Sequence, residues 1–481
     1  YYSQLRLEAL GAESSEELLG SLLGDDRSIA ALKKLLKERT GGNPFFLEES
    51  VRSLVESGTL AGTRGDYRLA RTFDSVQIPA TVQSILASRI DRLPPDEKRI
   101  LQSAAVIGKV GKELPFTLLR GLGEHDEQEL RAGLAHLQAS EFLYETSLFP
   151  DLEYTFKHAL THEIAYGSML HDRRRALHGA IVEVIERLYP ERLAEQVERL
   201  AHHSLHGELW EKAVDYFHGS ARKAIARSAY GEAAACYDHA LAAIARLPDD
   251  RATRLRGVKL RFELHSWLGP LGQTSRAIES LSQAEPIAEA LGDRRLLARL
   301  LAQTGMCRWL QGSFDRALES GRRALDIAIA IGDGSSQVNV GYVLGMVHYS
   351  LGDFPRAIEV FDRALGLLDE QRFSPRFHSF YSVNLRVGLG LAFGQLGRIG
   401  EGLENANQAL RTAEGTGDSH ELSVAHSVLG FIHFQRGEYQ TAVRIFERGR
   451  EICERTALAV TLKVMSVDLG RSYVHSGRAL E

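Results

Sequence analysis

The sequence predicts a mainly α-helical protein in which helices and a small pair of strands precede a right-handed solenoid of helical hairpins. Three observations support this: glycine pairs that recur in the C-terminal half, amphipathic helix patterns in the N-terminal half, and two short strand-like stretches between them. The chain has 481 residues, 44% of them hydrophobic and 25% charged, which suggests several domains of ordinary composition. We divide it into four parts, residues 1–78, 79–170, 171–250 and 251–481.

Composition excludes several classes of protein. A formal net charge of -5 gives no electrostatic case for nucleic-acid binding. Cys236, Cys307 and Cys453 lie far apart, which fits a reducing compartment and provides neither a disulfide framework nor a zinc site. No apolar run approaches the ~20 residues that a membrane span needs. We therefore expect a cytoplasmic protein that binds neither a membrane nor nucleic acid directly.

The first part, residues 1–78, contains a tight turn between two helices. A helix is predicted over 28–39, and the glycines at 41 and 42 can close it with positive φ. Asn43 precedes a proline, so it is pushed out of the helical region and can cap the next helix, with Pro44 at the first helical position. This helix continues to Gly58. The stretch TGGNPFFLEE (40–49) can therefore be a turn that needs no ligand.

The second part, residues 79–170, combines helices with strands. After the short hairpin around Arg64-Gly65-Asp66, which residues 59–71 form within the first part, amphipathic helices follow over 79–139. The stretches FLYETS and LEYTFKH read as a strand pair turned by Phe149-Pro150-Asp151, and a helix follows. Helices followed by a two-stranded wing look like a winged-helix domain. The nearest basic run, Arg173–Arg175, stands alone, so a solvated helix face explains it better than DNA binding.

The third and fourth parts carry a repeat. Irregular copies begin in the connector 171–250, with Tyr230, Ala233, Tyr237 and Ala240. Glycines seven residues apart then recur as 305/312, 345/352, 390/397, 430/437 and 470/477. By subtraction, the second glycines of successive pairs are spaced by 40, 45, 40 and 40 along the sequence. We expect the first glycine to let helix A lie close to helix B, and the second to end helix A in a left-handed conformation.

Other positions of the repeat fit a helical hairpin. A bulky residue and then a small one follow each turn, as in Phe354 and Ala357, and the triplets LGD, IGD and TGD mark the ends of B helices. This pattern resembles the tetratricopeptide repeat, with the best match at Leu344, Gly345, Gly352, Phe354, Ala357, Phe361 and Ala364. The usual period is ~34 residues, so a spacing of 40 implies longer helices. Such an array is a binding surface for a protein, peptide or small effector rather than a catalyst.

The order of parts resembles the regulatory half of the STAND class of signal-transduction ATPases. In bacteria, members with such repeats are often fused to class III adenylate or guanylate cyclase, protein kinase or LuxR-type DNA-binding domains. The stretch GGNPFFLEE matches the Gly-x-Pro element of that class, which makes residues 1–78 a lid-like remnant. The resemblance implies that Gly42, Asn43 and Pro44 contribute to a nucleotide site, with Pro44 against the adenine. It also implies that His158, in FKHALTHEIAY, is a phosphate sensor; a hydrogen-bonded histidine at a strand-to-helix junction is the alternative.

One departure from that class concerns the phosphates. The sequence contains no GxxxxGK[ST], so no phosphate-binding loop is present. We therefore expect the ATPase core, with its ATP or ADP and Mg²⁺, to lie before Tyr1, and no cofactor in this segment. We also expect the last repeat to be truncated, with the apolar face of its helix A exposed around Leu469 and Tyr473.

Catalytic and metal motifs are weak. HEIAY (162–166) lacks the second histidine of a zinc protease motif, because Tyr166 occupies that position. His202 and His206 share a helix face beside His203, so a metal is conceivable, although a solvated helix end is the simpler interpretation. We predict no catalytic residue and no metal site.

Two functions remain. The first is the sensor and scaffold arm of a nucleotide-dependent switch that controls an attached output domain. The second is a stand-alone tetratricopeptide-type adaptor with no nucleotide role.

Overall fold

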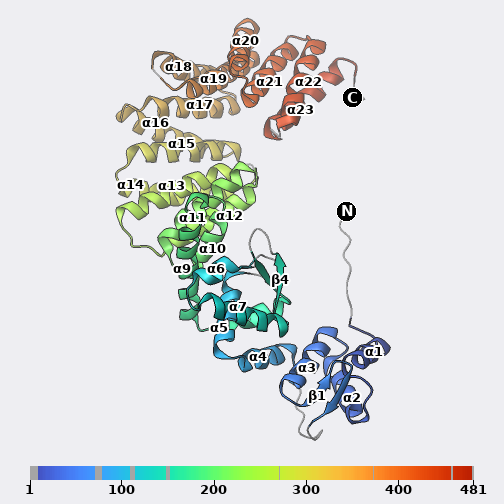
Figure 1. The fold of residues 1–481 in the computed structure, drawn as a ribbon. Coiled ribbons are helices and arrows are strands. Elements are labelled where there is room, and N and C mark those ends of the chain that lie inside the picture. Colours follow the sequence, from blue (N-terminus) through green and yellow to red (C-terminus); the bar gives the residue numbers. More distant parts are fainter. Residues whose placement is uncertain are drawn as a thin grey trace. The chain divides into compact units, whose positions relative to one another are not determined.

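The computed structural model describes residues 9–70, 79–108, 114–147, 152–269, 271–371, 373–456 and 459–478. These form two compact units, residues 1–216 and 217–481 (Figure 1). The described residues contain 23 α-helices, which confirms the mainly helical prediction and the helical-repeat solenoid. None of these helices is long and apolar enough to cross a membrane. The four-part division of the chain stays a prediction.

The first unit begins with three helices and a hairpin. Helices α1 (Ala12–Leu23), α2 (Ala30–Thr40) and α3 (Pro44–Glu56) share a small apolar core, and a 3-10 turn, η1 (Arg27–Ile29), precedes α2. Strands β1 (Leu60–Thr63) and β2 (Asp66–Leu69) pair antiparallel with Thr63 opposite Asp66. The hairpin predicted around Arg64-Gly65-Asp66 is thereby confirmed.

Helices and a three-stranded sheet follow. Their bounds are α4 (Val82–Arg92), α5 (Pro95–Ile107), β3 (Leu114–Pro115), α6 (Phe116–Gly121), α7 (Glu127–Ala139), β4 (Leu143–Ser147), β5 (Glu153–Phe156) and α8 (Ala159–Gly167). The antiparallel sheet has the order β3-β5-β4, so the predicted strand pair is confirmed. The sequence did not reveal β3, because two residues show no alternation. The turn predicted at Phe149-Pro150-Asp151 lies outside the described residues.

The core of this region continues into the next helices. The remaining elements are α9 (His171–Leu188), η3 (Pro190–Arg192), α10 (Val197–His206) and α11 (Trp210–Ala226), which continues into the second unit. Ile181, Val182 and Ile185 of α9 are buried in the same cluster as Leu101, Leu134, Leu143 and Phe156. Helix α9, which the sequence placed in the connector, therefore packs as part of the preceding core.

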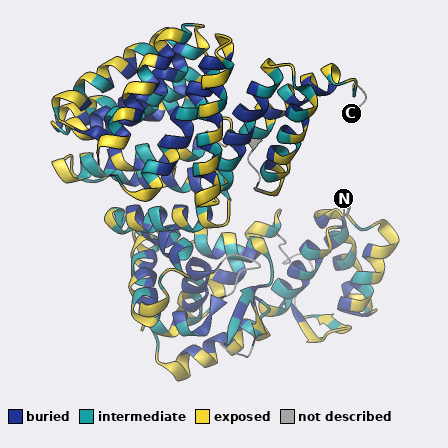
Figure 2. Cartoon of the chain, turned by 90° about the horizontal axis from the view of Figure 1, so that it is seen from above, coloured by how far each residue is buried: buried dark blue, intermediate teal, exposed yellow. Residues whose placement is uncertain are grey.

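The second unit is a stack of helices with a regular period. The helices are α12 (Tyr230–Ile244), α13 (Arg251–Leu268), α14 (Thr274–Ala290), α15 (Arg294–Leu310), α16 (Phe314–Ala330), α17 (Gly334–Ser350), α18 (Phe354–Glu370), α19 (Pro375–Gln395), α20 (Ile399–Thr416), α21 (Ser419–Gln435), α22 (Tyr439–Thr456) and α23 (Ala459–His475). From α13 on, odd-numbered helices are the A helices of the hairpins and even-numbered ones the B helices. Figure 2 shows buried residues on the faces between neighbouring helices.

Glycines have the two roles that the sequence predicts. At the ends of A helices, Gly312 and Gly352 have φ of 76° and 78°, and at the end of a B helix Gly332 has φ of 65°. Inside α17, a Cβ on Gly345 would lie 2.3 Å from Cε1 of Phe361 in α18. Helices A and B therefore approach closely where the first glycine of the pair lies.

A helices of successive hairpins also contact one another, from α15 to α17, α19, α21 and α23. B helices pack mainly on their neighbours in chain order. The A helices therefore form the inner side of the stack, where a solenoid of this kind presents its groove.

The expectation for the last helix is wrong in one respect. Leu469 and Tyr473 of α23 are buried in the core that α23 shares with α22, rather than exposed. The apolar residues of α23 that face solvent are Val464, Val467 and Val474. The pattern of this one helix did not distinguish the face that packs on α22 from the opposite one.

Candidate functional site

The Gly42-Asn43-Pro44 turn has the predicted geometry. Helix α2 ends at Thr40 and is followed by Gly41, which has φ of 57°. Gly42 has φ of 79°, and a Cβ there would lie 2.4 Å from the backbone oxygen of Leu10, so only glycine fits. The side chain of Asn43 caps α3 by accepting a hydrogen bond of 3.1 Å from the backbone N–H of Phe46. Asn43 and Pro44 are exposed, so the turn presents its proline to solvent.

His158 lies against this turn. It precedes α8 at the junction with β5, and its ring centroid is 4.0 Å from that of Phe45, the residue after Pro44. The fold therefore brings together two places, far apart in the sequence, that the resemblance assigned to one site. Whether a nucleotide binds there stays a prediction.

The imidazole of His158 has an unsatisfied nitrogen. Its Nε2 is buried and has no hydrogen-bond partner in the part of the chain that the structure describes. The alternative of a hydrogen-bonded junction histidine is therefore not supported for this atom. Burial, and then the charge of Lys157, lower the pKa of His158, although Glu49 and Glu48 oppose the shift. A neutral imidazole with an orphaned nitrogen can bond a ligand atom.

A buried arginine of α4 joins α3 to the segment between α7 and β4. Arg89 of α4 is 2% exposed and forms ion pairs with Glu49 and Glu56 of α3. It also donates a hydrogen bond of 2.9 Å to the backbone oxygen of Ser140, and its guanidinium lies 4.6 Å from the ring centroid of Phe142. Burial acts to lower the pKa of Arg89, but the bonds and charges of Glu56 and Glu49 raise it. The guanidinium therefore fixes α3, which carries the turn, relative to the sheet.

The sequence contained a signal for the burial of Arg89 that the sequence analysis did not use. Arg89 lies on the face of α4 that also carries Ile85, Leu86 and Ile90, all of them buried. An arginine among apolar residues of one helix face indicates a buried ion pair. Its partners could not be identified, because they come from another helix.

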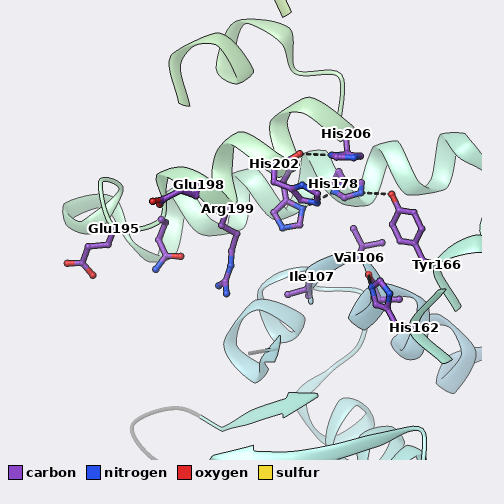
Figure 3. Close-up of a pocket in the computed structure, with 13 residues that line it drawn as sticks. Val106, Ile107, His162, Tyr166, His178, Glu195, Glu198, Arg199, His202 and His206 are labelled. Atoms are coloured by element: carbon purple, nitrogen blue, oxygen red, sulfur yellow. Dashed lines mark hydrogen bonds between the residues drawn. The ribbon is translucent and has the colours of Figure 1, made fainter. Parts of the chain in front are cut away.

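The histidines of α10 form part of a larger cluster (Figure 3). A hydrogen bond of 2.8 Å joins Nδ1 of His178, in α9, to Nδ1 of His203. The other ring nitrogen of His178, Nε2, lies 3.1 Å from the hydroxyl of Tyr166. His203 and His178 are each 1% exposed, whereas His206 is exposed. The solvated helix end predicted for these residues is therefore wrong for His203.

This cluster lines a pocket of about 480 Å³ that also contains Glu195, Glu198 and Arg199. Burial, and then the charges of His206 and His202, lower the pKa of His178 to about 3. Burial and His178 lower that of His203 as well. Among the described residues, no group of three or more histidine, cysteine or acidic side chains is arranged to hold a metal ion. His178 and His203 therefore form a buried pair of neutral imidazoles at the centre of the cluster.

The inner side of the repeat array carries partly exposed aromatic residues. Tyr342 and Tyr349 of α17 and Tyr381 of α19 pack on the core of their hairpins while staying partly accessible. Burial raises the pKa of Tyr342 to about 12, so its hydroxyl stays protonated. The sequence could not assign these residues to the groove, because a repeat pattern marks the packed positions rather than the accessible ones.

Comparison with protein families identifies the repeats. Models of the tetratricopeptide repeat match residues 342–376, which cover most of α17 and all of α18, and residues 381–455, from α19 into α22. These parts of the chain are therefore tetratricopeptide repeats, which confirms the repeat type predicted from Leu344 to Ala364.

A curated relative matches part of the chain. An uncharacterized protein of Rhizobium meliloti (strain 1021) is 26% identical over 247 residues, which cover 50% of this chain and 23% of that protein. The chain therefore matches about a quarter of its relative's length.

Solved structures with a similar fold include a STAND protein and two Rap proteins. A STAND protein with a tetratricopeptide repeat sensor from Pyrococcus horikoshii is 12% identical, and the match covers 97% of this chain and 63% of that chain with a TM-score of 0.43. A Rap protein complexed with competence and sporulation factor is 15% identical over 66% of this chain and 93% of that one, with a TM-score of 0.40. The Rap conjugation gene regulator of plasmid pLS20, in complex with the Phr* peptide, is 13% identical over 81% and 97%, with a TM-score of 0.39. These values are too low to assign a function.

Proposed function

We propose that this chain, in which residues 342–376 and 381–455 are tetratricopeptide repeats, is the sensor and scaffold arm of a nucleotide-dependent signalling ATPase. In this proposal the array binds a protein or peptide partner, or a small effector, in its groove. The first unit closes over a nucleotide held by an ATPase core, and an attached output domain responds. The observation that carries the nucleotide role is the orphaned Nε2 of His158 beside the Gly42-Asn43-Pro44 turn.

The binding role of the array rests on its repeats. The A helices contact one another along the inner side of the stack and leave aromatic side chains partly accessible there. Such a surface gains binding energy by burying tyrosine and phenylalanine faces at low cost in side-chain entropy.

The residues at the turn fit a nucleotide. Pro44 is exposed at the first turn of α3, where its flat ring can pack against an adenine, and the N-terminal end of α3 carries a positive partial charge. His158 can donate its Nε2–H to a phosphate oxygen once that nitrogen carries the proton. When ATP or ADP is bound with Mg²⁺, the nucleotide supplies the energy difference between two states of the switch. This chain would sense which nucleotide is present.

The experiment compares His158→Ala and Pro44→Ala in the full-length protein. A hydrogen bond to a charged group is worth about 1.5–3 kcal/mol, so loss of the His158 bond should speed ADP release by roughly one to two decades. Basal output of the attached domain should rise, because the closed state loses stabilisation that the open state never had. His171→Ala, which removes an exposed histidine of the same unit, is the matched control and should leave the rate unchanged.

Melting temperature separates this proposal from the adaptor alternative. Pro44→Ala should cost at most about 1 kcal/mol of stability as a purely structural change. If both variants melt lower but release ADP at the wild-type rate, the turn and the histidine are structural and the chain is an adaptor.

The chain by itself should not bind ATP tightly. It has no phosphate-binding loop, so His158 and the turn can supply only a minor part of the affinity. Calorimetry with this chain should detect no saturable ATP binding in the micromolar range. A micromolar dissociation constant would contradict the expectation that another segment provides the phosphate site.

A further inference from the structure

Helix α19 is longer than the other A helices around it. It has 21 residues, whereas α15, α17 and α21 have 17 each. From the packing glycine to the last residue the two helices are equally long, Gly390 to Gln395 in α19 and Gly430 to Gln435 in α21. The additional length of α19 is therefore at its N-terminal end and amounts to about one turn. The longer interval in the glycine series, between Gly352 and Gly397, has its structural origin here.

This extra turn brings aromatic rings together. Phe377 lies in it, with its ring centroid 4.6 Å from that of Tyr381, and Phe380 lies 5.1 Å from Tyr381. Phe380 also stacks on His420 of α21 at 5.9 Å with an interplanar angle of 18°. With Glu421 of α21, these residues line a pocket of about 510 Å³. The pocket therefore lies at the N-terminal ends of two A helices, α19 and α21.

Glu421, one of the residues that line this pocket, is buried, and its carboxylate has no cation partner among the described residues. Glu421 is 3% exposed. Its Oε1 accepts a hydrogen bond of 3.1 Å from the Ser379 hydroxyl, and its Oε2 accepts one of 2.8 Å from the Thr416 hydroxyl. Throughout the ranges that the structure describes, no lysine, arginine or histidine nitrogen forms an ion pair with Glu421. A buried charge is costly unless it is paired, so this arrangement favours the arrival of a positive group.

The geometry selects one kind of cation. Each carboxylate oxygen accepts one bond and keeps a lone pair, so a donor fork can engage both oxygens. The aromatic faces of Phe380 and Tyr381 offer a surface on which a planar cation can stack. A guanidinium group meets both requirements, whereas the ammonium of lysine neither stacks nor forks.

We propose that this pocket binds the guanidinium group of an arginine side chain on a peptide or protein partner, paired with Glu421 and stacked on Phe380 and Tyr381. The proposal rests on the proposed role of the array as a binding surface and names the chemistry of the partner. Asp418, the exposed N-cap of α21, adds a second negative charge at the rim. Arg376 also lines the pocket and is exposed, so it is the intramolecular competitor for Glu421.

The test uses three synthetic probes and the intact 481-residue chain. The probes are pentapeptides of the form acetyl-Gly-Gly-Xaa-Gly-Gly-amide with arginine, lysine or citrulline at the centre, and ligand-observed NMR follows their titration. The arginine peptide should bind saturably. Citrulline has the same shape as arginine without the charge. The affinity of its peptide should be lower by a factor of roughly ten or more, as expected for loss of a charge-assisted hydrogen bond. The lysine peptide should fall between them.

Variants identify the site. Glu421→Gln and Phe380→Ala should each weaken arginine binding by roughly tenfold, whereas Glu414→Gln, an exposed carboxylate near the end of α20, should not change it. Arg376→Ala should leave the affinity unchanged or raise it. Glu421→Gln should keep the wild-type melting temperature, because the amide can still bond both hydroxyls. Equal binding of the citrulline peptide, no saturable arginine binding, or wild-type affinity in Glu421→Gln would each overturn the proposal.

A second measurement separates this proposal from the function of the groove. Random peptides displayed on phage are selected on the wild-type chain and tested again on Glu421→Gln and Tyr342→Ala. Enrichment of arginine that disappears in Glu421→Gln supports the pocket. Peptides that lose binding in Tyr342→Ala but keep it in Glu421→Gln, with no enrichment of arginine, overturn the pocket while the groove keeps its binding role.

Discussion

Arg89 shows at the residue scale how one side chain can hold two elements together. It pairs with Glu49 and Glu56 in a site where Glu49 is only 2% exposed. A buried pair of this kind adds little net stability over an apolar replacement of both partners, but removal of one partner leaves an isolated charge. Loss of Arg89 should therefore cost more stability than its ion pairs contribute, because its carboxylate partners lose a cation.

Arg89→Met should destabilise the first unit by about 1–3 kcal/mol, because the buried Glu49 would keep only its ion pair with Arg52. Hydrogen exchange of α3 and α4 in the full chain measures this loss. Arg99→Met, at an exposed pair with Asp96, should change stability by less than about 0.5 kcal/mol. A double variant Arg89→Met, Glu49→Gln should recover part of the loss, and a cost equal to that of the single variant would count against the lost Arg89–Glu49 pair as the cause.

The histidine cluster predicts a dependence of stability on pH. Histidine in an unfolded chain titrates near 6.5, whereas the pKa of folded His178 is lowered to about 3, chiefly by burial. Between these values the unfolded state binds more protons than the folded state, so stability falls as the pH falls below about 6.5. His178 alone should contribute a slope of up to about 1.4 kcal/mol per pH unit, and His203 should add to it.

Hydrogen exchange of α9 and α10 at pH 5 and pH 7.5 measures this slope. His178→Phe removes a titrating group and should flatten the slope even if it lowers stability at both pH values. His171→Ala, at an exposed position of α9, should keep the wild-type slope. A wild-type slope in His178→Phe would mean that other groups cause the acid sensitivity.

Residues that act locally could be predicted from the sequence, and residues that act across elements could not. The Asn43 cap and the left-handed Gly41 at the end of α2 depend on neighbours within a few positions, so spacing and φ preferences were sufficient. Arg89 pairs with Glu49, which lies 40 residues away in the chain, and His178 bonds His203, which lies 25 residues away. Only the folded chain places those partners.

Within single elements, the repeat hairpins were predictable because each one is built from the same packing rule. A small residue on helix A meets an aromatic ring on helix B, as Gly345 meets Phe361 and Gly430 meets Phe446. The short strand β3 was not predictable, because its pairing with β5 through Leu114 and Tyr154 is set by tertiary contacts rather than by a local pattern.

A pair of glycine variants in one hairpin tests this packing rule. Gly345→Ala would place a Cβ within 2.3 Å of the Phe361 ring and should destabilise the second unit by about 1–3 kcal/mol through overpacking. Gly366→Ala, at an exposed position of α18 with no atom within 4 Å, should stabilise by about 0.5–1 kcal/mol through helix propensity.

Chemical denaturation of the two variants, followed by circular dichroism, gives the sign of each change. We expect the two changes in stability to have opposite signs. Because both variants replace glycine by alanine, a difference in sign must come from the surroundings of each site. Stabilisation by Gly345→Ala would show that Phe361 moves aside at little cost.

At the scale of the whole molecule, each described helix of the array rests on its neighbours, so local stability depends on how many faces are covered. In the described part of the chain, α23 packs on α22 and α21 and leaves Val464 and Val467 at 58% and 64% exposure. Helix α21 is packed from both directions by α19, α20, α22 and α23.

Hydrogen exchange should therefore be faster over 459–478 than over 419–435. Val467→Lys should leave exchange in α23 nearly unchanged if this face is solvated. Equal protection of the two segments would mean that the exposed face of α23 is covered in solution.

The regular period of the array has a consequence for how such a chain can change in length. From α14 to α18, helices start at positions 274, 294, 314, 334 and 354. Each helix together with the turn after it therefore has the same number of residues. Unequal recombination that copies or deletes one whole hairpin would preserve every interface between neighbours and shift nothing downstream out of phase. The additional turn at the start of α19 breaks this period, so the hairpin that contains it is not interchangeable with its neighbours.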